Sequence, residues 1–360
     1  MRGVSQRSQP IGQPFPDRVL SWWQHHGRHD LPWQHPRTPY RVWVSEIMLQ
    51  QTRVETVVGY FRRFVERFPD VEALAAADLD DVLALWSGLG YYARARNLHA
   101  AARAIVGEHG GAFPADVESL RALPGIGAST AAAIVAQGFD RRAAILDGNV
   151  KRVIARHAGI EGWPGRTAVA RVLWAESEAR TPADRAADYT QAIMDLGATL
   201  CTPKAPACEA CPVAADCVAR RESRQAELPA PKPRTTVPER VQRYLVARDD
   251  RGRVLLQRRP PAGVWGGLWC VPEVGAVEVR RDEILPAPAP IRHAFTHFRL
   301  EMQFEHVRLD PSDRAVGDGG DRAWFTHEEA LAAGLPRPVR TLIEELDAPF
   351  QRSLDEASSQ

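Results

Sequence analysis

The chain has 360 residues, more than one hydrophobic core usually serves, so we expect two domains. Its net charge of +1 at pH 7 excludes a long polybasic tail and requires any nucleic-acid surface to be a local patch. The N-terminus lacks the apolar region of a secretory signal and no apolar run approaches membrane-spanning length, so we expect a cytoplasmic location.

Apolar residues recur at helical spacing from about residue 16 to residue 220, as in VLSWWQ, VETVVGYFRRFVERF, LDDVLALW and TAVARVLWAESEA. This period predicts an all-helical first half. Residues 224–238 carry four prolines and almost no large apolar side chains. That composition predicts a semi-extended linker.

Beyond the linker the period changes to that of strands. RYLVAR and RVLLQR flank a D-D-R-G turn at 249–252, and FRLEMQFEHV (298–307) places alternate apolar side chains on one face. Two short helices are expected near 327–334 and 337–346. The expected fold is therefore mainly α in the first half, with a smaller α+β domain after it. The expected boundaries are a helical domain at 16–223, a linker at 224–238, the second domain at 239–346 and a tail at 347–360.

The segment WVSEIMLQQTRV (43–54) places Glu46 among large apolar side chains. Such surroundings raise the pKa of a carboxyl group by desolvation, as a general acid near neutral pH requires. The alternative is structural, because Glu46, Gln50 and Arg53 can form the polar stripe of an amphipathic helix.

The stretch LPGIGASTAAAIV (123–135) predicts a tight turn followed by a helix. Gly125 and Gly127 can adopt left-handed backbone conformations, and without a Cβ they let backbone N–H groups approach a phosphate. The N-terminus of the Ala-rich helix favours the same anion. An ordinary helix–helix turn is the alternative. The phosphate interpretation is favoured by residues 141–156, which hold five Lys or Arg residues against one acid, Asp147 in LDGNVKR.

Four cysteines, Cys201, Cys208, Cys211 and Cys217, occur within one short segment. In a chain expected to be cytoplasmic, this density indicates metal ligation and not disulfides. Zinc sites usually draw on two separated Cys or His pairs, whereas one compact loop with a single Cys-x-x-Cys can wrap a four-iron cluster. Zinc is the alternative. The fifth cysteine, Cys270, lies among apolar residues and is expected in the core.

Together these segments resemble the helix-hairpin-helix, Gly/Pro…Asp superfamily of base-excision DNA glycosylases and, within it, the MutY-type adenine DNA glycosylases. The resemblance extends from about residue 16 to residue 345. It implies that Glu46 protonates adenine, that Asp147 stabilises the sugar cation or attacks it transiently, and that Asn149 positions the sugar or water. An N-glycosidic bond breaks through an oxocarbenium-like state, for which one acid and one carboxylate are the minimal set.

The same resemblance implies a pocket for an adenine that has left the base stack. Gln191, in YTQAIMDLGA, matches a position that contacts this adenine, and Trp33 and Arg37 are expected to line the pocket. A structural role is the alternative for both residues, because an amide on a helix face and a tryptophan in a core are as common as functional ones.

DNA contacts are implied at two further segments. In GLGYYARARNL (88–98) the glycines allow close approach, Tyr91 is the expected stacking wedge, and Arg94 and Arg96 are expected to meet phosphates. A turn over the core is the alternative. Gln51 matches a wedge from the other side of the strand. The remaining DNA-binding positions are Gly125, Gly127 and Ser129.

Ser129 also bears on the reaction class. In the endonuclease III branch of the superfamily, a lysine in the hairpin attacks the sugar and the strand is then cut; Ser129 occupies that position here. The chain has three lysines against forty-three arginines, and arginine cannot form the required Schiff base. Lys151, one helical turn after Asp147, is left as the candidate for a residual lyase activity.

The resemblance further implies that the cysteine loop holds a [4Fe–4S] cluster that staples it. The C-terminal half resembles a Nudix domain whose signature opens with Gly267, Glu273 and Arg281, but residues 282–290 lack the paired glutamates that hold magnesium, so no hydrolase activity is expected. In the adenine glycosylase family this domain inspects 8-oxoguanine through a Phe-Ser-His loop. Residues Phe295, Thr296 and His297 stand in that place.

The expected function is therefore excision of adenine mispaired with 8-oxoguanine or guanine in double-stranded DNA, by a nucleoid-associated monomer without an efficient lyase step. Three alternatives remain: an endonuclease III-like pyrimidine glycosylase, a non-catalytic DNA clamp and a Nudix nucleotide hydrolase. The first is disfavoured by Ser129 and the second by the joint presence of Glu46 and Asp147. The third is disfavoured by the broken Nudix signature.

Overall fold

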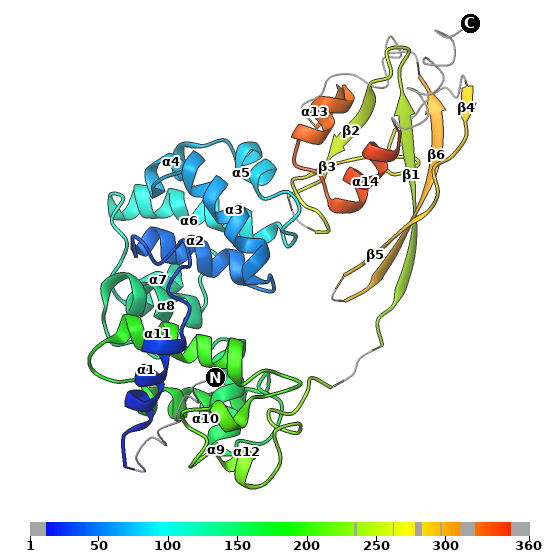
Figure 1. Cartoon of the computed structure of the whole chain (residues 1–360). Coiled ribbons are helices and arrows are strands. Elements are labelled where there is room, and N and C mark those ends of the chain that lie inside the picture. Colours follow the sequence, from blue (N-terminus) through cyan, green and yellow to red (C-terminus); the bar gives the residue numbers. More distant parts are fainter. Residues whose placement is uncertain are drawn as a thin grey trace, which may run out of the picture. The chain divides into compact units, whose positions relative to one another are not determined.

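The computed structural model describes residues 12–233, 236–261, 263–277, 283–295, 297–309 and 321–346. Within this range the chain forms two compact units. The first contains residues up to 75 together with 100–233, and the second contains residues 76–99 together with those from 236 onwards. Helices make up the first unit and a sheet dominates the second, as Figure 1 shows and as the two sequence periods predict.

The described part of the first unit contains helices and no strand, which confirms the all-helical prediction. Helix α6 begins in the second unit and continues into the first. The helices are α1 (Phe15–His26), α2 (Pro39–Leu49), α3 (Val54–Arg67), α4 (Val71–Ala76), α6 (Ala93–His109), α7 (Val117–Ala122), α8 (Ala128–Phe139), α9 (Gly148–Ala158), α10 (Thr167–Arg180), α11 (Ala186–Asp195) and α12 (Val218–Arg221), with a π-helical turn η1 (Leu196–Leu200) and a short 3₁₀ helix η2 (Cys208–Ala210).

Local sequence fixes the ends of the helices that matter for the site. Thr38 caps α2 by accepting the Arg41 backbone N–H at 3.3 Å, and Pro39 suits the first helical position. Asp147 caps α9, and Gly159 ends it with a left-handed φ of 69°. Gly127 is the N-cap residue of α8, and no side chain caps this helix end.

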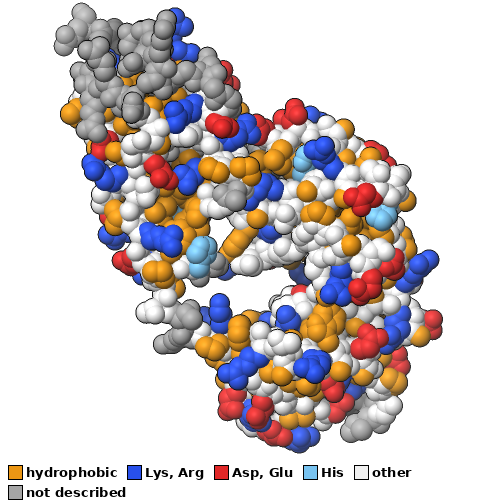
Figure 2. Space-filling view, turned by 180° about the vertical axis from the view of Figure 1, so that it is seen from behind, with side chains coloured by type: hydrophobic (Ala, Val, Ile, Leu, Met, Phe, Trp, Pro, Cys, Tyr) orange, Lys and Arg blue, Asp and Glu red, His pale blue; other side chains and the backbone are white. Residues whose placement is uncertain are grey.

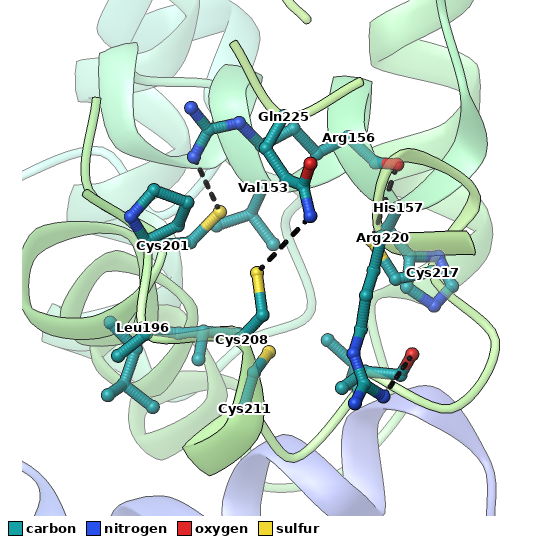
Figure 3. Close-up of a pocket in the computed structure, with 15 residues that line it drawn as sticks. Val153, Arg156, His157, Leu196, Cys201, Cys208, Cys211, Cys217, Arg220 and Gln225 are labelled. Atoms are coloured by element: carbon teal, nitrogen blue, oxygen red, sulfur yellow. Dashed lines mark hydrogen bonds between the residues drawn. The ribbon is translucent and has the colours of Figure 1, made fainter. Parts of the chain in front are cut away.

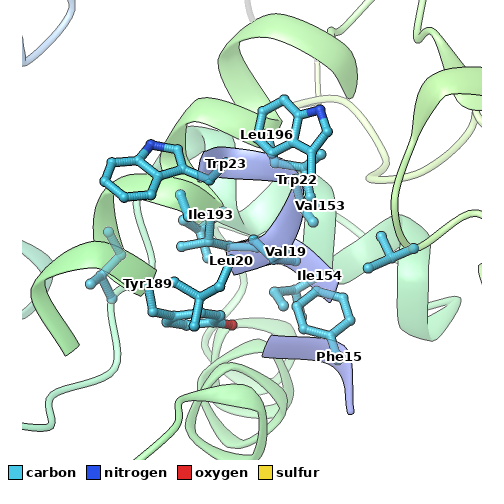
Figure 4. Packing of buried hydrophobic residues seen from close by; sticks show 14 of the residues in the cluster. Phe15, Val19, Leu20, Trp22, Trp23, Val153, Ile154, Tyr189, Ile193 and Leu196 are labelled. Atoms are coloured by element: carbon cyan, nitrogen blue, oxygen red, sulfur yellow. The ribbon is translucent and has the colours of Figure 1, made fainter. Parts of the chain in front are cut away.

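A hydrophobic core holds α9 in place. Figure 4 shows the aromatic side chains of α1 packed around aliphatic side chains of α9 and α11. Burial of each large apolar side chain stabilises such a core by about 1.5–3 kcal/mol. The core therefore anchors the helix that Asp147 caps. Its members include Phe15, Val19, Leu20, Trp22, Trp23, Val150, Val153, Ile154, Tyr189, Ile193 and Leu196.

Helix α2 packs directly on α8 because of one glycine. A Cβ added to Gly138 on α8 would lie 2.8 Å from the Cα of Pro39, which is closer than real contacts allow. The absence of a side chain at Gly138 thus lets the helix carrying Glu46 approach the helix that follows the predicted phosphate-binding turn.

The linker differs from its prediction at its start. Residues 224–228 pack on the first unit, and Leu228 is buried with its carbonyl oxygen accepting a hydrogen bond from Arg156 at 2.9 Å. Arg224 pairs with Glu161 at 2.5 Å. The prediction of an extended linker from residue 224 is therefore wrong for these residues, because one apolar side chain and one arginine suffice to fix them.

The described residues of the second unit form a seven-stranded mixed sheet with the order β3-β2-β1-β6-β4, in which β5 also pairs with β6 and β7 with β2. Strands β1 and β6 run parallel, from Glu239 beside Arg299 to Arg248 beside Arg308, and the other pairs are antiparallel. The D-D-R-G hairpin is confirmed. The elements are α5 (Leu79–Leu85), β1 (Glu239–Arg248), β2 (Val254–Arg258), β3 (Trp269–Cys270), β4 (Glu283–Leu285), β5 (Ile291–Ala294), β6 (Arg299–Arg308), β7 (Arg322–Phe325), α13 (His327–Ala332) and α14 (Arg337–Leu346).

Both faces of this sheet are covered. The predicted alternation is confirmed, since Phe298, Leu300, Met302 and Phe304 are all buried in the core that α13 and α14 cover. Cys270 lies in the same core, as expected. The other face buries a smaller cluster: Leu245, Ala247, Leu255, Val277, Val307 and Leu309. The two C-terminal helices lie where the sequence predicts them, and the tail at 347–360 lies outside the described residues.

Charged side chains of both signs are interspersed on the face of the molecule seen in Figure 2. This distribution agrees with the net charge of +1. Among the described residues, no helix is both long enough and apolar enough to cross a bilayer.

Candidate active site

Two carboxyl groups from distant parts of the sequence meet in the first unit. Glu46 projects from α2 and is half-buried, with buried residues on both sides of it in the helix. Desolvation by burial and, as a smaller contribution, the negative charge of Asp147 together raise the pKa of Glu46 to about 8. At neutral pH Glu46 is therefore mostly protonated and can donate a proton. The amphipathic-stripe alternative does not account for this environment.

Asp147 lies in a different environment although it is a neighbour of Glu46. Its Oδ1 accepts the Val150 backbone N–H at 2.7 Å at the start of α9. Burial raises its pKa, whereas the backbone N–H groups of Val150 and Asn149 and the charges of Arg152 and Lys151 act in the opposite direction. Glu46 has no such opposing contributions among the causes of its shift. Glu46 is thus the more readily protonated of the two groups, whereas Asp147 has N–H donors and cations that favour its ionised form.

Ser129 lies next to this pair. Its hydroxyl accepts the Leu146 backbone N–H at 3.2 Å, one residue before Asp147. The Ser129 hydroxyl therefore supports the backbone just before Asp147. Lys151 is close enough for its charge to lower the pKa of Asp147.

The turn before α8 matches its prediction in part. Gly125 has a left-handed φ of 74°, as expected. Gly127 does not, because its φ of −86° and ψ of 171° are those of an extended residue that caps a helix. A Cβ at Gly127 would meet no atom within 4 Å, so its surface is open. Together with the uncapped N–H groups of α8, this surface allows an anion to approach the backbone.

Asn149 is held by contacts that the sequence did not indicate. Arg152 donates to Asn149 Oδ1 at 2.9 Å, to the Gly197 carbonyl at 2.6 Å and to the Cys201 carbonyl at 2.6 Å. A Cβ at Gly197 would lie 2.7 Å from the Cβ of Asn149, so η1 packs tightly against the start of α9. Arg152 therefore fixes both the amide and the start of the cysteine loop.

Gln191 is buried on α11 and donates to Asp195 Oδ1 at 2.8 Å. Within the described residues, the buried Gln191 Oε1 has no hydrogen-bond donor. Asp195 is fully buried and also accepts from Trp23 Nε1 at 3.0 Å and from the backbone and guanidinium N–H groups of Arg28 at 2.6–2.9 Å. This hub orients Gln191, and sequence reasoning missed it because its members are far apart in the chain.

The contacts of the two other predicted pocket residues are also those of purely structural residues. Trp33 is buried and packs edge-to-face on Phe61 with 5.4 Å between ring centroids, as a core residue does. Arg37 pairs with Asp188 at 3.5 Å. Their roles in a base pocket stay predictions.

Both predicted wedge residues adopt left-handed backbone conformations although neither is glycine. Tyr91 has a φ of 50° and is 47% exposed, and Gln51 has a φ of 59° and is exposed. Such conformations cost about 1–3 kcal/mol and cluster at functional sites. Each side chain is thus held out from its own unit by a strained turn.

Arg94 and Arg96, which were predicted to contact phosphates, both donate hydrogen bonds within the protein, and their phosphate contacts stay predictions. Arg94 is buried under the turn, where it donates to the carbonyls of Leu89 at 3.2 Å and Gly90 at 3.1 Å and its guanidinium lies 5.5 Å from the Tyr91 ring centroid. Arg96 donates to the Gly266 carbonyl. Desolvation lowers the pKa of both groups, to about 10 for Arg94. Arg94 therefore supports the turn from within, whereas Arg96 supports the loop that contains Gly266.

Two parts of the chain match known protein families. Residues 44–202 match the family described as HhH-GPD superfamily base excision DNA repair protein, and residues 243–345 match the NUDIX domain. An adenine DNA glycosylase of Buchnera aphidicola subsp. Acyrthosiphon pisum is 34% identical over 339 residues, covering 92% of this chain and 97% of that protein. The adenine DNA glycosylase of Homo sapiens is 32% identical, covering 91% of this chain and 73% of that protein.

The chain belongs to the adenine DNA glycosylase family. It is a DNA glycosylase of base-excision repair that acts on adenine, and DNA is its partner. A solved structure described as a thermostable thymine-DNA glycosylase aligns with 28% identity and a TM-score of 0.53, over 58% of this chain and 95% of that one. It therefore agrees with the helical fold of the catalytic part.

The four cysteines of this adenine glycosylase surround one pocket beside α9, as Figure 3 shows. In the part of the chain that is described, they do not form a group able to hold a single metal ion. Two N–H donors point at the sulfur atoms: Arg156 Nη1 lies 3.3 Å from Cys201 Sγ, and Gln225 Nε2 lies 3.8 Å from Cys208 Sγ. Four thiols facing one space with donors behind them fit a polynuclear iron–sulfur group.

The C-terminal unit of the glycosylase places its candidate reading loop at the β5–β6 hairpin. The Phe295 backbone N–H donates to the Phe298 carbonyl at 2.8 Å, and His297 lies beside the Phe298 ring. Thr296 and Arg281 lie outside the described residues. Residues 283–285, within the segment that lacks the paired glutamates, form strand β4.

Proposed function

We propose that this chain removes adenine paired with 8-oxoguanine or guanine from double-stranded DNA, as a monomer and without an efficient strand-cutting step. The observation that carries this proposal is the pair of carboxyl groups in one site, with Glu46 mostly protonated at neutral pH and Asp147 held at the N-terminus of α9. Such a pair supplies both groups that cleavage of an N-glycosidic bond requires.

In the proposed reaction, the Glu46 carboxyl gives its proton to a ring nitrogen of the flipped adenine. The bond between C1′ and the base then breaks, and its electron pair leaves with the adenine. Asp147 stabilises the positive charge that develops on the sugar, as preorganised charges in a water-poor site do. Water bonds to C1′ with the help of Asn149 and returns a proton to Glu46, which restores the acid.

The neighbouring residues have proposed roles that follow from their settings. The unpaired Gln191 Oε1 is an acceptor suited to the amino group of adenine, while Asp195 holds the other side of this amide. Trp33 and Arg37 are proposed to border the same pocket. The open backbone at Gly127 and the first N–H groups of α8 bind a phosphate. Tyr91 and Gln51 fill the space that the extruded base leaves.

The opposite base is proposed to be read by the Phe295–His297 loop of the second unit. The hydrogen bond across the hairpin fixes the loop ends, and ring contacts from Trp265 and His293 surround Phe295. The chemistry of the loop suits recognition of an oxidised purine edge by polar groups next to aromatic rings.

The function is tested with duplexes that carry one labelled adenine opposite 8-oxoguanine, guanine or thymine. Under single-turnover conditions, we expect strand breaks at adenine in the first two duplexes only, and only after alkali treatment, because Ser129 cannot form a Schiff base. Equal excision opposite thymine would contradict the proposed specificity. Breaks without alkali that disappear in Lys151→Arg would instead show an efficient lyase step.

We further propose that Cys201, Cys208, Cys211 and Cys217 hold a [4Fe–4S] cluster whose role is to fix the loop between η1 and α12. Burial raises the pKa of Cys211 to about 12, so thiolates there need the positive charge of bound iron. The N–H groups of Arg156 and Gln225 that face the sulfur atoms are suited to iron–sulfur ligands.

The cluster is tested by Cys211→Ser, with Cys270→Ser as the matched control in a buried core. We expect wild type and Cys270→Ser to bind about four iron atoms and four sulfides per chain. Cys211→Ser should lose most of both, together with the visible absorbance, and should unfold at lower denaturant concentration. Stoichiometric zinc in place of iron and sulfide would contradict the proposal.

A further inference from the structure

The loop proposed to read the opposite base is supported by one tryptophan from outside the hairpin. The Phe295 ring stacks on the buried Phe298 at 4.5 Å between centroids, with 24° between the planes. Trp265 lies 5.5 Å from Phe295 and 5.8 Å from His293. The position of Phe295 therefore depends on Trp265 as well as on its own hairpin.

Trp265 is itself held in a strained loop. Its φ of 56° is left-handed, and the glycines on either side of this stretch, Gly263 and Gly267, have φ values of 94° and 77°. A Cβ at Gly266 would lie 2.3 Å from the carbonyl oxygen of Pro261, so the loop folds back on itself tightly at this residue. A bulky residue with a left-handed φ persists only where its surroundings over-determine it.

One of those surroundings is the helix that follows the wedge turn. The Arg96 guanidinium, in the first turns of α6, donates to the carbonyl of Gly266, next to Trp265. Backbone hydrogen bonds connect Tyr91 to Arg96: the Arg94 N–H donates to the Tyr91 carbonyl at 2.8 Å and the Arg96 N–H to the Tyr92 carbonyl at 3.1 Å. A short run of covalent and hydrogen-bonded contacts thus connects Tyr91 with Trp265.

Other contacts within the second unit hold the segment 76–99, some at the turn of Tyr91 and one at α5. The Tyr92 hydroxyl donates to the Leu335 carbonyl at 2.8 Å and accepts the Gly88 N–H at 3.4 Å. Arg258 pairs with Asp80 at 2.5 Å. By its contacts, the segment 76–99 thus groups with the sheet, although the sequence boundaries assigned it to the helical half.

We propose that Trp265 and Arg96 are positioning residues that couple the loop of Phe295 to the turn of Tyr91, so that the base held by the loop sets how far Tyr91 enters the DNA stack. This inference rests on the proposed function for the identity of the two DNA-contacting elements. The physical argument is that a displacement of Phe295 moves Trp265, that the close packing of Gly266 on Pro261 limits how far the loop can absorb it, and that Arg96 transmits it to α6.

The coupling is tested in the full-length Glu46→Gln protein, which is expected to bind adenine-containing duplexes without cutting them. A 2-aminopurine placed beside the mispair reports unstacking, and Tyr91→Ala defines the part of its fluorescence that depends on the wedge. Trp265→Gly removes the ring and keeps a residue that adopts the left-handed φ without strain. Arg96→Met removes the donor to Gly266, and Arg96→Lys keeps an N–H donor.

We expect Trp265→Gly and Arg96→Met each to reduce the Tyr91-dependent signal by about three- to tenfold. The double variant should lose no more of the signal than the single variant with the larger loss. Arg96→Lys should retain most of the signal. Arg258→Met serves as the control, because it breaks the ion pair with Asp80 in the same unit and should leave the signal unchanged.

Three results would overturn the coupling. Additive losses in the double variant would show independent effects, and an equal loss in Arg258→Met would show general loosening of the unit. A uniform loss of DNA affinity in Arg96→Met, with the salt slope reduced by about one, would show a phosphate contact instead. Failure of the proposed function is visible separately, as equal excision by the active wild type opposite 8-oxoguanine, guanine and thymine.

Discussion

Glu46→Gln is expected to lower the single-turnover rate of adenine excision by about 10³-fold while leaving DNA binding within about twofold of wild type. Glutamine keeps the size of the side chain but cannot give a proton to the base. The environment of Glu46 is built for that donation, since burial and the charge of Asp147 raise its pKa to about 8. The measurement is single-turnover excision from an adenine–8-oxoguanine duplex at pH 7, together with a binding titration.

The matched control for this variant is Glu55→Gln. Glu55 is an exposed acid in the first turn of α3, so the same chemical change there should leave excision unaltered. A Glu46→Gln enzyme that retains more than about a tenth of the wild-type rate would contradict the role of Glu46 as the general acid.

Asp147→Asn is expected to lower the rate by about 10²–10³-fold with little loss of stability. Asparagine caps a helix about as well as aspartate, so α9 and the core behind it should persist, whereas the negative charge beside the sugar is lost. The measurements are single-turnover excision and the free energy of unfolding from denaturant titration.

Asp116→Asn makes the same substitution at another helix cap. Asp116 caps α7 by accepting the Ser119 N–H at 2.8 Å and lies outside the carboxyl pair, so its variant should excise adenine at the wild-type rate. If Asp147→Asn reduced activity only in proportion to a loss of folded protein, Asp147 would be a structural cap and nothing more.

Asp147 shows how one residue serves the fold and the reaction together. The N–H groups that it satisfies at the start of α9 also favour its ionised form, and the core around α1 fixes that helix. Glu46 is instead mostly protonated, because burial on α2 raises its pKa and no N–H donor is among the causes of its shift. The difference between two carboxyl groups thus arises from their backbone settings and not from their residue types.

Local patterns predicted much of this molecule. The helical and alternating periods identified α1, α3, α10 and β6, because those periods reflect which faces are buried. The residues of the carboxyl pair could be found because Glu46 stands out in an apolar segment and Asp147 follows a glycine-rich turn. Left-handed Gly125 and buried Cys270 were likewise predictable from their immediate neighbours.

What the sequence did not reveal depends mostly on partners far away in the chain. Arg94 and Arg96 lie in an arginine-rich segment that indicates phosphate contacts, yet Arg94 finds carbonyl acceptors in its own turn and Arg96 donates to the carbonyl of Gly266, far along the chain. The packing of Leu228 depends on Arg156, and the hub at Asp195 depends on Trp23 and Arg28. No local period reveals such contacts.

The central claim is that Glu46 acts in its protonated form beside an ionised Asp147, and the pH dependence of single-turnover excision tests it most directly. Because the proton is needed on Glu46, the rate should be level near neutral pH and fall about tenfold per pH unit above a pKa of about 8. Since Asp147 must be ionised and burial raises its pKa, the rate should also fall at acidic pH. A rate that stays level or rises between pH 7 and about 9.5 would contradict the account.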